Sequence, residues 1–419
     1  MALWRSVLAL CFTIFIPEFV QSTSLYSNDR QPLADCCVGC NASEAHFGYT
    51  EATCHGPTRW HLLTTDWRFC GRSTQSPVNI RTSSSVFRRE LQAYPLQFQN
   101  LCLRIPARIR NNGHSPHFDT ESEAIGLFNV PGMQGQRFTF NEFHIHLGKT
   151  FAEGSEHLID GNKSPMEAHL VFYNDAYGEA ITAKRRPGGL SVIGVMIQVA
   201  EVGDETDGVY IERKDKNCGP RRHRPYSRCV CNDDNPYSAH ICKASRKCQC
   251  KDDNDCPGQS KCRLNDVIPG RYCGKAKSCR VRFARDLSYL MEKYYRRIRF
   301  YTNVAQNLEE RQWVNIPEGI SPSDILPYDW SYFTYQGSLT TPPCFESVTW
   351  INMRCPIKVS RRAYNNLAFV RDVNGPPIRL FGLDRPAQRG LYGGPGVSVF
   401  RDFRWETVGS ETSFCNVNK

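Results

Sequence analysis

Short runs in which hydrophobic and polar residues alternate occupy two parts of the chain, residues 45–202 and residues 330 onward. Gly, Pro and Asn separate these runs, and this spacing is typical of β-strands joined by turns. One stretch differs, because Leu287, Leu290, Met291 and Tyr294 recur at helical spacing and predict an amphipathic helix near residues 281–300. The pattern therefore predicts a mostly β protein with helical additions.

An apolar run near the N-terminus has a different character. Residues 7–16 follow Arg5 and precede Val20-Gln21-Ser22, which is the order of charge, apolar core and small residue in a signal peptide. The run is too short to span a bilayer, and no later stretch is longer and equally apolar. We expect residues 1–22 to be a signal peptide and the mature protein to be exported and not membrane-spanning.

The alternating pattern stops between residues 203 and 279, where ten cysteines and many Lys and Arg residues occur instead. Such a segment cannot build an apolar core and must be held together by disulfides. Its halves are alike, since Cys229-Val-Cys231-Asn-Asp-Asp-Asn is similar to Cys248-Gln-Cys250-Lys-Asp-Asp-Asn. The chain thus divides into a lead at 23–44, one domain at 45–205 and 279–415, and an inserted module at 206–278.

Cysteine content and charge add to this picture. The chain has 20 cysteines, of which one lies in the predicted signal peptide, and such a density suits an oxidising compartment. The odd remainder leaves one thiol free or paired with another chain in a disulfide-linked oligomer. The triplets at Asn41 and Asn162 are candidate glycosylation sites. The net charge of +10 indicates either anionic partners, such as acidic matrix polymers, or simple solubility; it does not favour nucleic acid without a recognition motif.

Three histidines are the candidate metal ligands. Alternation in Asn141-Glu-Phe-His-Ile-His-Leu-Gly148 places His144 and His146 on one face of a strand, and Glu167-Ala-His-Leu-Val171 places His169 beside Glu167 and Val171. If the two strands are neighbours in one sheet, three imidazoles converge. Three nitrogens with an open fourth position are the ligand set of a catalytic zinc.

The motifs resemble those of the α-carbonic anhydrases. The resemblance rests on His144-Ile-His-Leu-Gly, Gly154-Ser-Glu-His157, Glu167-Ala-His-Leu-Val171, Ser338-Leu-Thr-Thr-Pro-Pro343, Gln75-Ser-Pro-Val-Asn-Ile80 and Asn112-Gly-His114, in the family's order. It extends from about residue 45 to Arg385-Pro-Ala-Gln388 without the insert. Within the family, the wording Pro165-Met-Glu-Ala-His-Leu-Val-Phe172 and the place of the insert are most similar to the nacrein branch of mollusc shell matrix.

The resemblance implies a fold, a reaction and a set of roles. The fold would be a twisted, mainly antiparallel central sheet with peripheral helices, and the reaction the reversible hydration of CO₂ to bicarbonate. The roles would be zinc ligands His144, His146 and His169; catalytic groups His114 (proton shuttle), Glu156 and Thr340; substrate contacts Thr340, Thr341, Val171, Val192, Leu339 and Trp350; support from Glu142, His157, Glu167 and Tyr49; and a disulfide between Cys70 and Cys344. Each residue also has an ordinary reading, with Thr340 and Thr341 as strand residues, Glu156 as a solvated acid and His114 as a turn residue.

Among the departures of the chain from the family, two concern hydrogen bonds at the site. Glu142 stands where the family has Gln, so an anion would contact the first zinc histidine. Leu383-Asp384 replace an Asn-aromatic pair, and we expect this change to remove a hydrogen bond that supports the site.

The resemblance also indicates a setting, the extracellular matrix of a shell, where bicarbonate would feed calcium carbonate deposition and the insert would modulate crystal growth. The partners would then be CO₂, bicarbonate, acidic matrix polymers and the mineral surface. Ca²⁺ is a weaker expectation, because the acidic pairs Asp233-Asp234 and Asp252-Asp253 lie among many cations. The alternative is a matrix, calcium-binding or mineral-binding protein with weak or no catalysis that acts through the insert.

Overall fold

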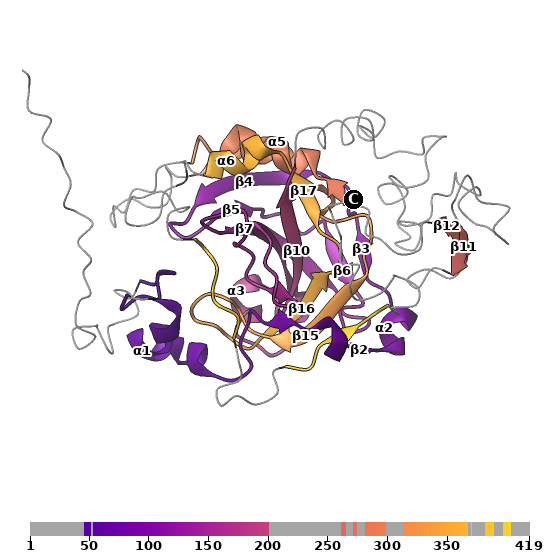
Figure 1. Ribbon diagram of the computed structural model, residues 1–419, viewed down its shortest axis with the longest axis horizontal. Coiled ribbons are helices and arrows are strands. Elements are labelled where there is room, and N and C mark those ends of the chain that lie inside the picture. Colours follow the sequence, from indigo (N-terminus) through magenta and orange to yellow (C-terminus); the bar gives the residue numbers. More distant parts are fainter. Residues whose placement is uncertain are drawn as a thin grey trace, which may run out of the picture. The chain divides into compact units, whose positions relative to one another are not determined.

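The computed structural model describes residues 46–51, 53–200, 261–264, 271–274, 281–298, 313–367, 370, 382–388 and 397–403 (Figure 1). All of them belong to one compact unit, Cys37–Lys419. The predicted signal peptide and lead lie outside the described residues, as do Asn41 and nearly all of the predicted insert. Of the insert, two short strands are described, β11 (Lys261–Leu264) and β12 (Arg271–Gly274), which pair antiparallel with Cys262 opposite Cys273.

The described strands of the main body begin and end as follows: β1 Asn79–Ile80, β2 Val86–Phe87, β3 Gln97–Gln99, β4 Ile105–Asn111, β5 Pro116–Asp119, β6 Gly126–Phe128, β7 Phe138–Leu147, β8 Leu158–Ile159, β9 Met166–Asn174, β10 Leu190–Val199, β13 Arg282–Phe283, β14 Val314–Ile320, β15 Tyr332–Gly337, β16 Val348–Met353, β17 Ile357–Val359 and β18 Phe400–Arg401. The helices are short: α1 Trp60–Leu63, α2 Arg89–Ala93, α3 Ala180–Ala183, α5 Arg285–Tyr294 and α6 Arg361–Asn366, with 3₁₀ turns η2 Pro57–Arg59, η3 Thr65–Gly71, η4 Thr82–Ser84, η5 Asp175–Tyr177 and η8 Pro322–Asp324.

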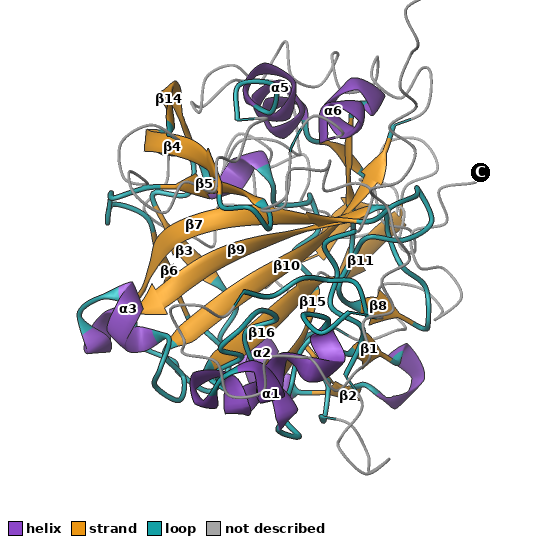
Figure 2. Ribbon diagram, turned by 90° about the vertical axis from the view of Figure 1, so that its left-hand side faces the viewer, coloured by secondary structure: helices purple, strands orange, loops and turns teal. Residues whose placement is uncertain are grey.

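One large sheet organises the described residues (Figure 2). Its main path runs β14-β4-β5-β7-β9-β10-β16-β15-β18-β2, with β3, β6, β13 and β17 attached beside it. Neighbours on this path are antiparallel except at β10/β16 and β18/β2, which are parallel. The predicted fold, mostly β around a mainly antiparallel sheet, is confirmed.

A β-bulge in β7 determines which side chains face the core. The pairing of β7 with β9 shifts by one residue between Phe140 and Glu142. Because side chains alternate along a strand, the extra residue reverses the alternation. As a result Phe138 and Phe140 before the bulge and Phe143 after it all join the same apolar core, and the polar side chains after the bulge face the opposite side.

The apolar side of the sheet is covered by α5 and α6, which lie next to each other (Figures 1 and 2). The four residues that predicted a helix, Leu287, Leu290, Met291 and Tyr294, are all buried in α5. The helix is shorter than predicted at its start, because Arg282 and Phe283 form strand β13 beside β17. Among the described residues, no helix combines the length and the apolar content that crossing a membrane requires.

Candidate metal centre

Three histidines converge on the polar side of the sheet. His144 and His146 lie on β7, His169 lies on β9, and His144 pairs directly with His169 in the register of the two strands. One nitrogen of each ring lies within 4.8 Å of one nitrogen of each of the others. The side chains of His146 and His169 are about 1% exposed, whereas that of His144 is 15% exposed, so the group opens toward solvent on the His144 side.

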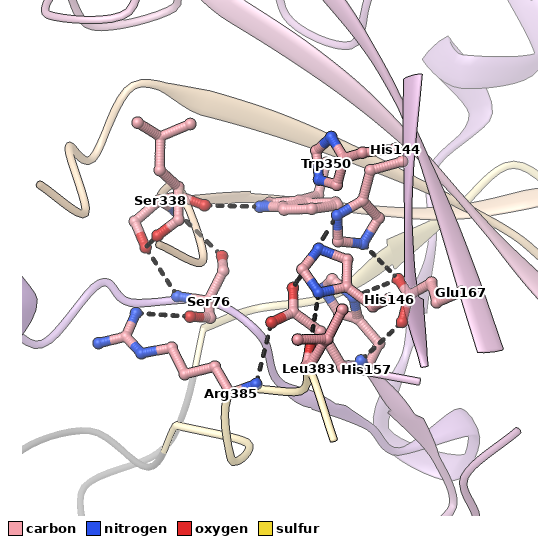
Figure 3. Close-up of polar contacts among 12 residues, drawn as sticks. Ser76, His144, His146, His157, Glu167, Ser338, Trp350, Leu383 and Arg385 are labelled. Atoms are coloured by element: carbon pink, nitrogen blue, oxygen red, sulfur yellow. Dashed lines mark hydrogen bonds and ion pairs between the residues drawn. The ribbon is translucent and has the colours of Figure 1, made fainter. Parts of the chain in front are cut away.

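The second nitrogen of each ring has a hydrogen-bond partner that fixes its orientation. His144 Nδ1 lies 3.0 Å from Glu142 Oε1. His146 Nδ1 lies 2.5 Å from the Leu383 carbonyl oxygen, and His169 Nε2 lies 2.9 Å from Glu167 Oε1 (Figure 3). The atoms that remain for a common ligand are His144 Nε2, His146 Nε2 and His169 Nδ1. His146 Nε2 is buried and has no hydrogen-bond partner within the described part of the chain.

These nitrogens fit a zinc ion. Burial lowers the pKa of His169 to about 4 and that of His146 well below its usual value, and the neighbouring histidines lower the latter further. These two rings are therefore neutral near pH 7, which is the form that binds a metal. Three imidazole nitrogens, with no fourth ligand grouped with them among the described residues, suit Zn²⁺, and the carboxylates behind the rings are the usual outer partners of zinc histidines.

Two carboxylates each serve two imidazoles. Glu167 accepts from His169, and its two oxygens also lie 2.8 Å from Nδ1 and from the backbone N–H of His157. Burial alone would raise the pKa of Glu167, but His157 and His169 hold it well below its usual range. In the same way Glu142 lies between His144 and His117, whose Nδ1 is 3.1 Å from Glu142 Oε2. Glu142 is thus an anion that two rings share.

Glu156 lies beside the three histidines. Its Oε2 is 3.4 Å from His146 Nε2 and 3.9 Å from His169 Nδ1, and its Oε1 accepts a hydrogen bond of 3.0 Å from the backbone N–H of Arg385. Burial raises the pKa of Glu156 well above its usual value, while the Thr340 hydroxyl and the Arg385 N–H act against this rise. Glu156 is therefore not a solvated surface acid.

An apolar wall adjoins the histidines. Val192 and Trp350 are buried in a second core cluster, and Val171 and Leu339 pack against it half-buried. The Trp350 ring lies 4.8 Å from the His169 ring, and its Nε1 donates to the Ser338 carbonyl at 3.0 Å, so its polar atom points away from the wall (Figure 3). The wall offers a small apolar molecule a place next to the three nitrogens.

The loop that carries Thr340 and Thr341 is tied down at its far end. A disulfide joins Cys344 in this loop to Cys70 in η3, 274 residues earlier in the chain. The Cys344 carbonyl also accepts from Gln75 Nε2 at 3.2 Å. Thr340 is buried and Thr341 half-buried, so the two threonines differ in their access to solvent.

His114 lies apart from the three histidines, on the turn between β4 and β5. Its ring stacks on Phe47 with centroids 3.9 Å apart and an angle of 16° between the planes. Burial lowers the pKa of His114 to about 4, and His117 and His46 contribute to the same direction. Tyr49 packs on the same aromatic cluster as Phe47, and burial raises its pKa well above its usual value.

We expect Phe47→Ala to raise the pKa of His114 from about 4 toward the ordinary value of about 6.5, because the ring loses its cover. In the native protein the unfolded chain binds a proton at His114 more readily than the folded chain does. Stability therefore falls as the pH drops from about 6.5 to about 4, and this loss should shrink by about 2 kcal/mol in the variant. Proton NMR titration of the imidazole, with urea unfolding at pH 7 and pH 5, measures both. Phe151→Ala, at a ring that stacks on Tyr364 instead, is the matched control; equal titration of His114 in all three proteins would contradict the expectation.

Three residues contribute to the site in ways that the sequence did not indicate. Arg385 is a buried cation whose guanidinium donates to Gln75, Ser76 and Cys70. Tyr335 lies with its hydroxyl 2.7 Å from His157 Nε2. Gly194 faces His169 across β9 and β10, and a Cβ there would lie 2.3 Å from Asn352 Oδ1 and 3.0 Å from Glu167 Oε1. A glycine inside an otherwise apolar strand was the one signal that could have been read.

One expectation was wrong. Leu383-Asp384 does not remove the supporting hydrogen bond, because the backbone carbonyl of Leu383 accepts from His146 whatever its side chain is. Asp384 forms an ion pair with Lys163 instead.

Comparison with known proteins agrees with this geometry. The model of the eukaryotic-type carbonic anhydrase family matches residues 55–212 and 287–388. A nacrein-like protein of Mytilus californianus is 32% identical over 374 residues, which cover 80% of this chain and 96% of the relative. Nacrein of Pinctada fucata is 28% identical over 424 residues (86% and 89%), and human carbonic anhydrase 7 is 28% identical over 321 residues (76% and 83%). The chain belongs to the eukaryotic-type carbonic anhydrase family.

Proposed function

We propose that this carbonic anhydrase is an exported zinc enzyme that interconverts CO₂ and bicarbonate for calcium carbonate deposition. The observation that carries the catalytic part is the set of three imidazoles whose outer nitrogens are engaged and whose inner nitrogens lie together. His144, His146 and His169 would hold the zinc. Zinc, when bound, supplies a hydroxide nucleophile at neutral pH by lowering the pKa of water from 15.7 to about 7.

The chain's own residues would orient the reactants. Glu156 is buried next to the metal ligands, and the Thr340 hydroxyl is near enough to lower its pKa. In the working site this hydroxyl would donate a hydrogen bond to Glu156. With its proton committed to Glu156, the Thr340 oxygen can only accept from a nucleophile, and it would thereby fix the direction of the attacking lone pair. Thr341, which is more exposed, would contact departing bicarbonate.

The apolar wall would position CO₂, which offers little for hydrogen bonding. Val171, Val192, Leu339 and Trp350 adjoin His169, so a molecule held against them is within reach of the reacting oxygen. The wall would also keep competing water away from that side of the site.

His114 would pass the released proton to buffer. The ring that stacks on Phe47 is neutral near pH 7 and so can accept a proton, but its low pKa limits how far it is protonated. Efficient proton transfer would require the His114 ring to move away from Phe47, so the stacking contact with Phe47 would slow this step.

The setting of the enzyme is proposed from its relatives and its sequence. Two of the relatives are called nacrein or nacrein-like. The family model omits residues 213–286, which supports an insertion near residues 206–278 in a domain formed by 45–205 and 279–415. After removal of a signal peptide at 1–22, with a lead at 23–44, we propose secretion into a shell matrix. There the basic insert would bind acidic matrix or mineral surfaces and modulate crystal growth, with direct Ca²⁺ binding ranked below this role.

The rival reading, a non-catalytic matrix protein, is disfavoured because all three histidines and their carboxylates are present and arranged. Zinc removal tests the choice. We expect the purified protein to contain one zinc per chain, to lose CO₂ hydration when dipicolinate removes the zinc, and to recover it when zinc is added back. Stopped-flow hydration with metal analysis of the same samples provides the measurement. Hydration that continues unchanged in zinc-free protein would refute the proposal, whereas zinc-bound protein without hydration would favour the matrix role.

A further inference from the structure

A row of arginine and phenylalanine side chains lies outside the catalytic site, on η3, the loop after Thr341 and the segment after α3. The row consists of Arg68, Phe69, Arg72, Phe345 and Arg185. Arg72 lies over the Phe69 ring at 4.2 Å from its centroid and Arg68 at 5.3 Å, while Arg185 lies over Phe345 at 5.6 Å. The two phenylalanines meet edge to face at 5.2 Å, which makes the row continuous.

Stacking on a ring holds a guanidinium in place without using its N–H donors. Of the three arginines in the row, Arg72 has a carboxylate partner, Glu346 at 3.7 Å. Arg68 and Arg185, like Arg186 beside them, form no ion pair with any carboxylate of the described residues. Burial lowers the pKa of Lys184, and the positive charge of the nearby Arg185 lowers it further. Because Arg68, Arg185 and Arg186 are also exposed, the row presents uncompensated cations to solvent.

The end of the row adjoins a hollow of about 450 Å³ lined by Ile181, Thr182, Arg185 and Arg186. Ile181 is 52% exposed, so an apolar surface lies free beside these charges. The hollow thus combines two guanidinium groups with an apolar contact.

We propose that this row and hollow form a docking surface for an acidic polypeptide segment of a partner protein. Carboxylates spaced along the segment would pair with Arg68, Arg185 and Arg186, since guanidinium groups bind carboxylates through two parallel hydrogen bonds. Ile181 and the half-buried Phe345 would take an apolar side chain of the same segment. This apolar component favours a polypeptide over a sulfated polysaccharide, which has no aliphatic side chains.

The surface is separate from the catalytic groups but attached to the loop that carries them. Phe69 is adjacent to Cys70 and Phe345 to Cys344, so the disulfide joins the two halves of the row at its centre. A docked segment would therefore lie against the outer side of the threonine loop, and the enzyme would be held near an acidic partner without losing access to its site.

The test uses the full-length protein and two fluorescent peptides, an oligo-aspartate and an aspartate peptide with interspersed leucines. Arg185→Glu with Arg186→Glu should weaken binding of both peptides by about tenfold. Ile181→Ser should weaken binding of the leucine-containing peptide alone. The matched control, Arg361→Glu with Arg362→Glu, changes the net charge equally and alters exposed arginines on α6. Figures 1 and 2 show α6 away from α3. Neither pair touches the catalytic groups, so unchanged CO₂ hydration verifies that each variant is folded.

Equal loss of affinity in the two charge-reversed proteins would mean that net charge alone attracts the peptides, and it would overturn the proposal. The same holds if the Arg185/Arg186 variant binds both peptides as the native protein does, because the basic insert would then account for binding. Heparin serves as a polysaccharide probe. If the Arg185/Arg186 variant loses more affinity for heparin than for the leucine-containing peptide, the surface binds a polysaccharide, and the proposal of a polypeptide partner is refuted.

Discussion

His169→Ala should contain little zinc and hydrate CO₂ at least about 10³-fold more slowly than the native protein. His169 supplies one of three nitrogens, and the change also leaves the buried carboxylate of Glu167 with one imidazole partner fewer. Both the loss of the His169 nitrogen and the loss of a partner for the Glu167 carboxylate should lower the affinity for zinc. Metal analysis after dialysis and stopped-flow hydration measure the two effects on the same sample.

The control for this variant is His61→Ala, at an exposed histidine on α1 that contacts none of the three ligands. It should keep one zinc per chain and the native rate. Retained zinc together with an unchanged rate in His169→Ala would show that the metal binds elsewhere, and the assignment of the site would have to be abandoned.

Arg385→Met should lower the free energy of unfolding by about 3 to 5 kcal/mol. The side chain is 1% exposed and donates to Gln75 Oε1 and to the carbonyl oxygens of Ser76 and Cys70. Burial lowers its pKa to about 10, so it is still a cation near pH 7. Methionine fills similar space but donates nothing, which leaves three buried acceptors without partners.

Urea unfolding of the zinc-loaded protein measures this loss. Arg89→Met on the surface of α2 is the matched change, and it should alter stability by less than about 0.5 kcal/mol. A loss of the same small size in Arg385→Met would indicate that water replaces the guanidinium at no cost, which contradicts the network described.

The parts of the site that follow a local pattern could be predicted from the sequence. Successive side chains of a β-strand point to opposite faces, so residues two apart lie on the same face. This places His144 and His146 on one face, and the same argument applies to Glu167 and His169. The helical spacing around Leu287 and Tyr294 likewise predicted the apolar face of α5. That the two histidine strands are neighbours required the family resemblance, since no local pattern specifies strand pairing.

The remaining features depend on contacts between distant segments. Arg385 reaches residues more than 300 positions earlier, and nothing in its neighbourhood in sequence indicates that it is buried. The stacking of His114 on Phe47 joins segments far apart in the chain in the same way. The Leu383 carbonyl was missed for another reason: a backbone atom performs its role, and substitutions of the side chain do not report on it.

The bulge in β7 has a consequence for how this enzyme can change. Before the bulge, the side chains that face the core occupy even-numbered positions, and after it they occupy odd-numbered ones. The one extra residue therefore lets both halves of the strand face the core with apolar side chains while His144 and His146 face the other side. Removing a single residue between Phe140 and Phe143 would turn every later side chain over and bury the metal ligands in the core. The number of residues in β7 is therefore as constrained as the identity of its histidines. An insertion or deletion in this strand should be far less tolerated than most substitutions in it.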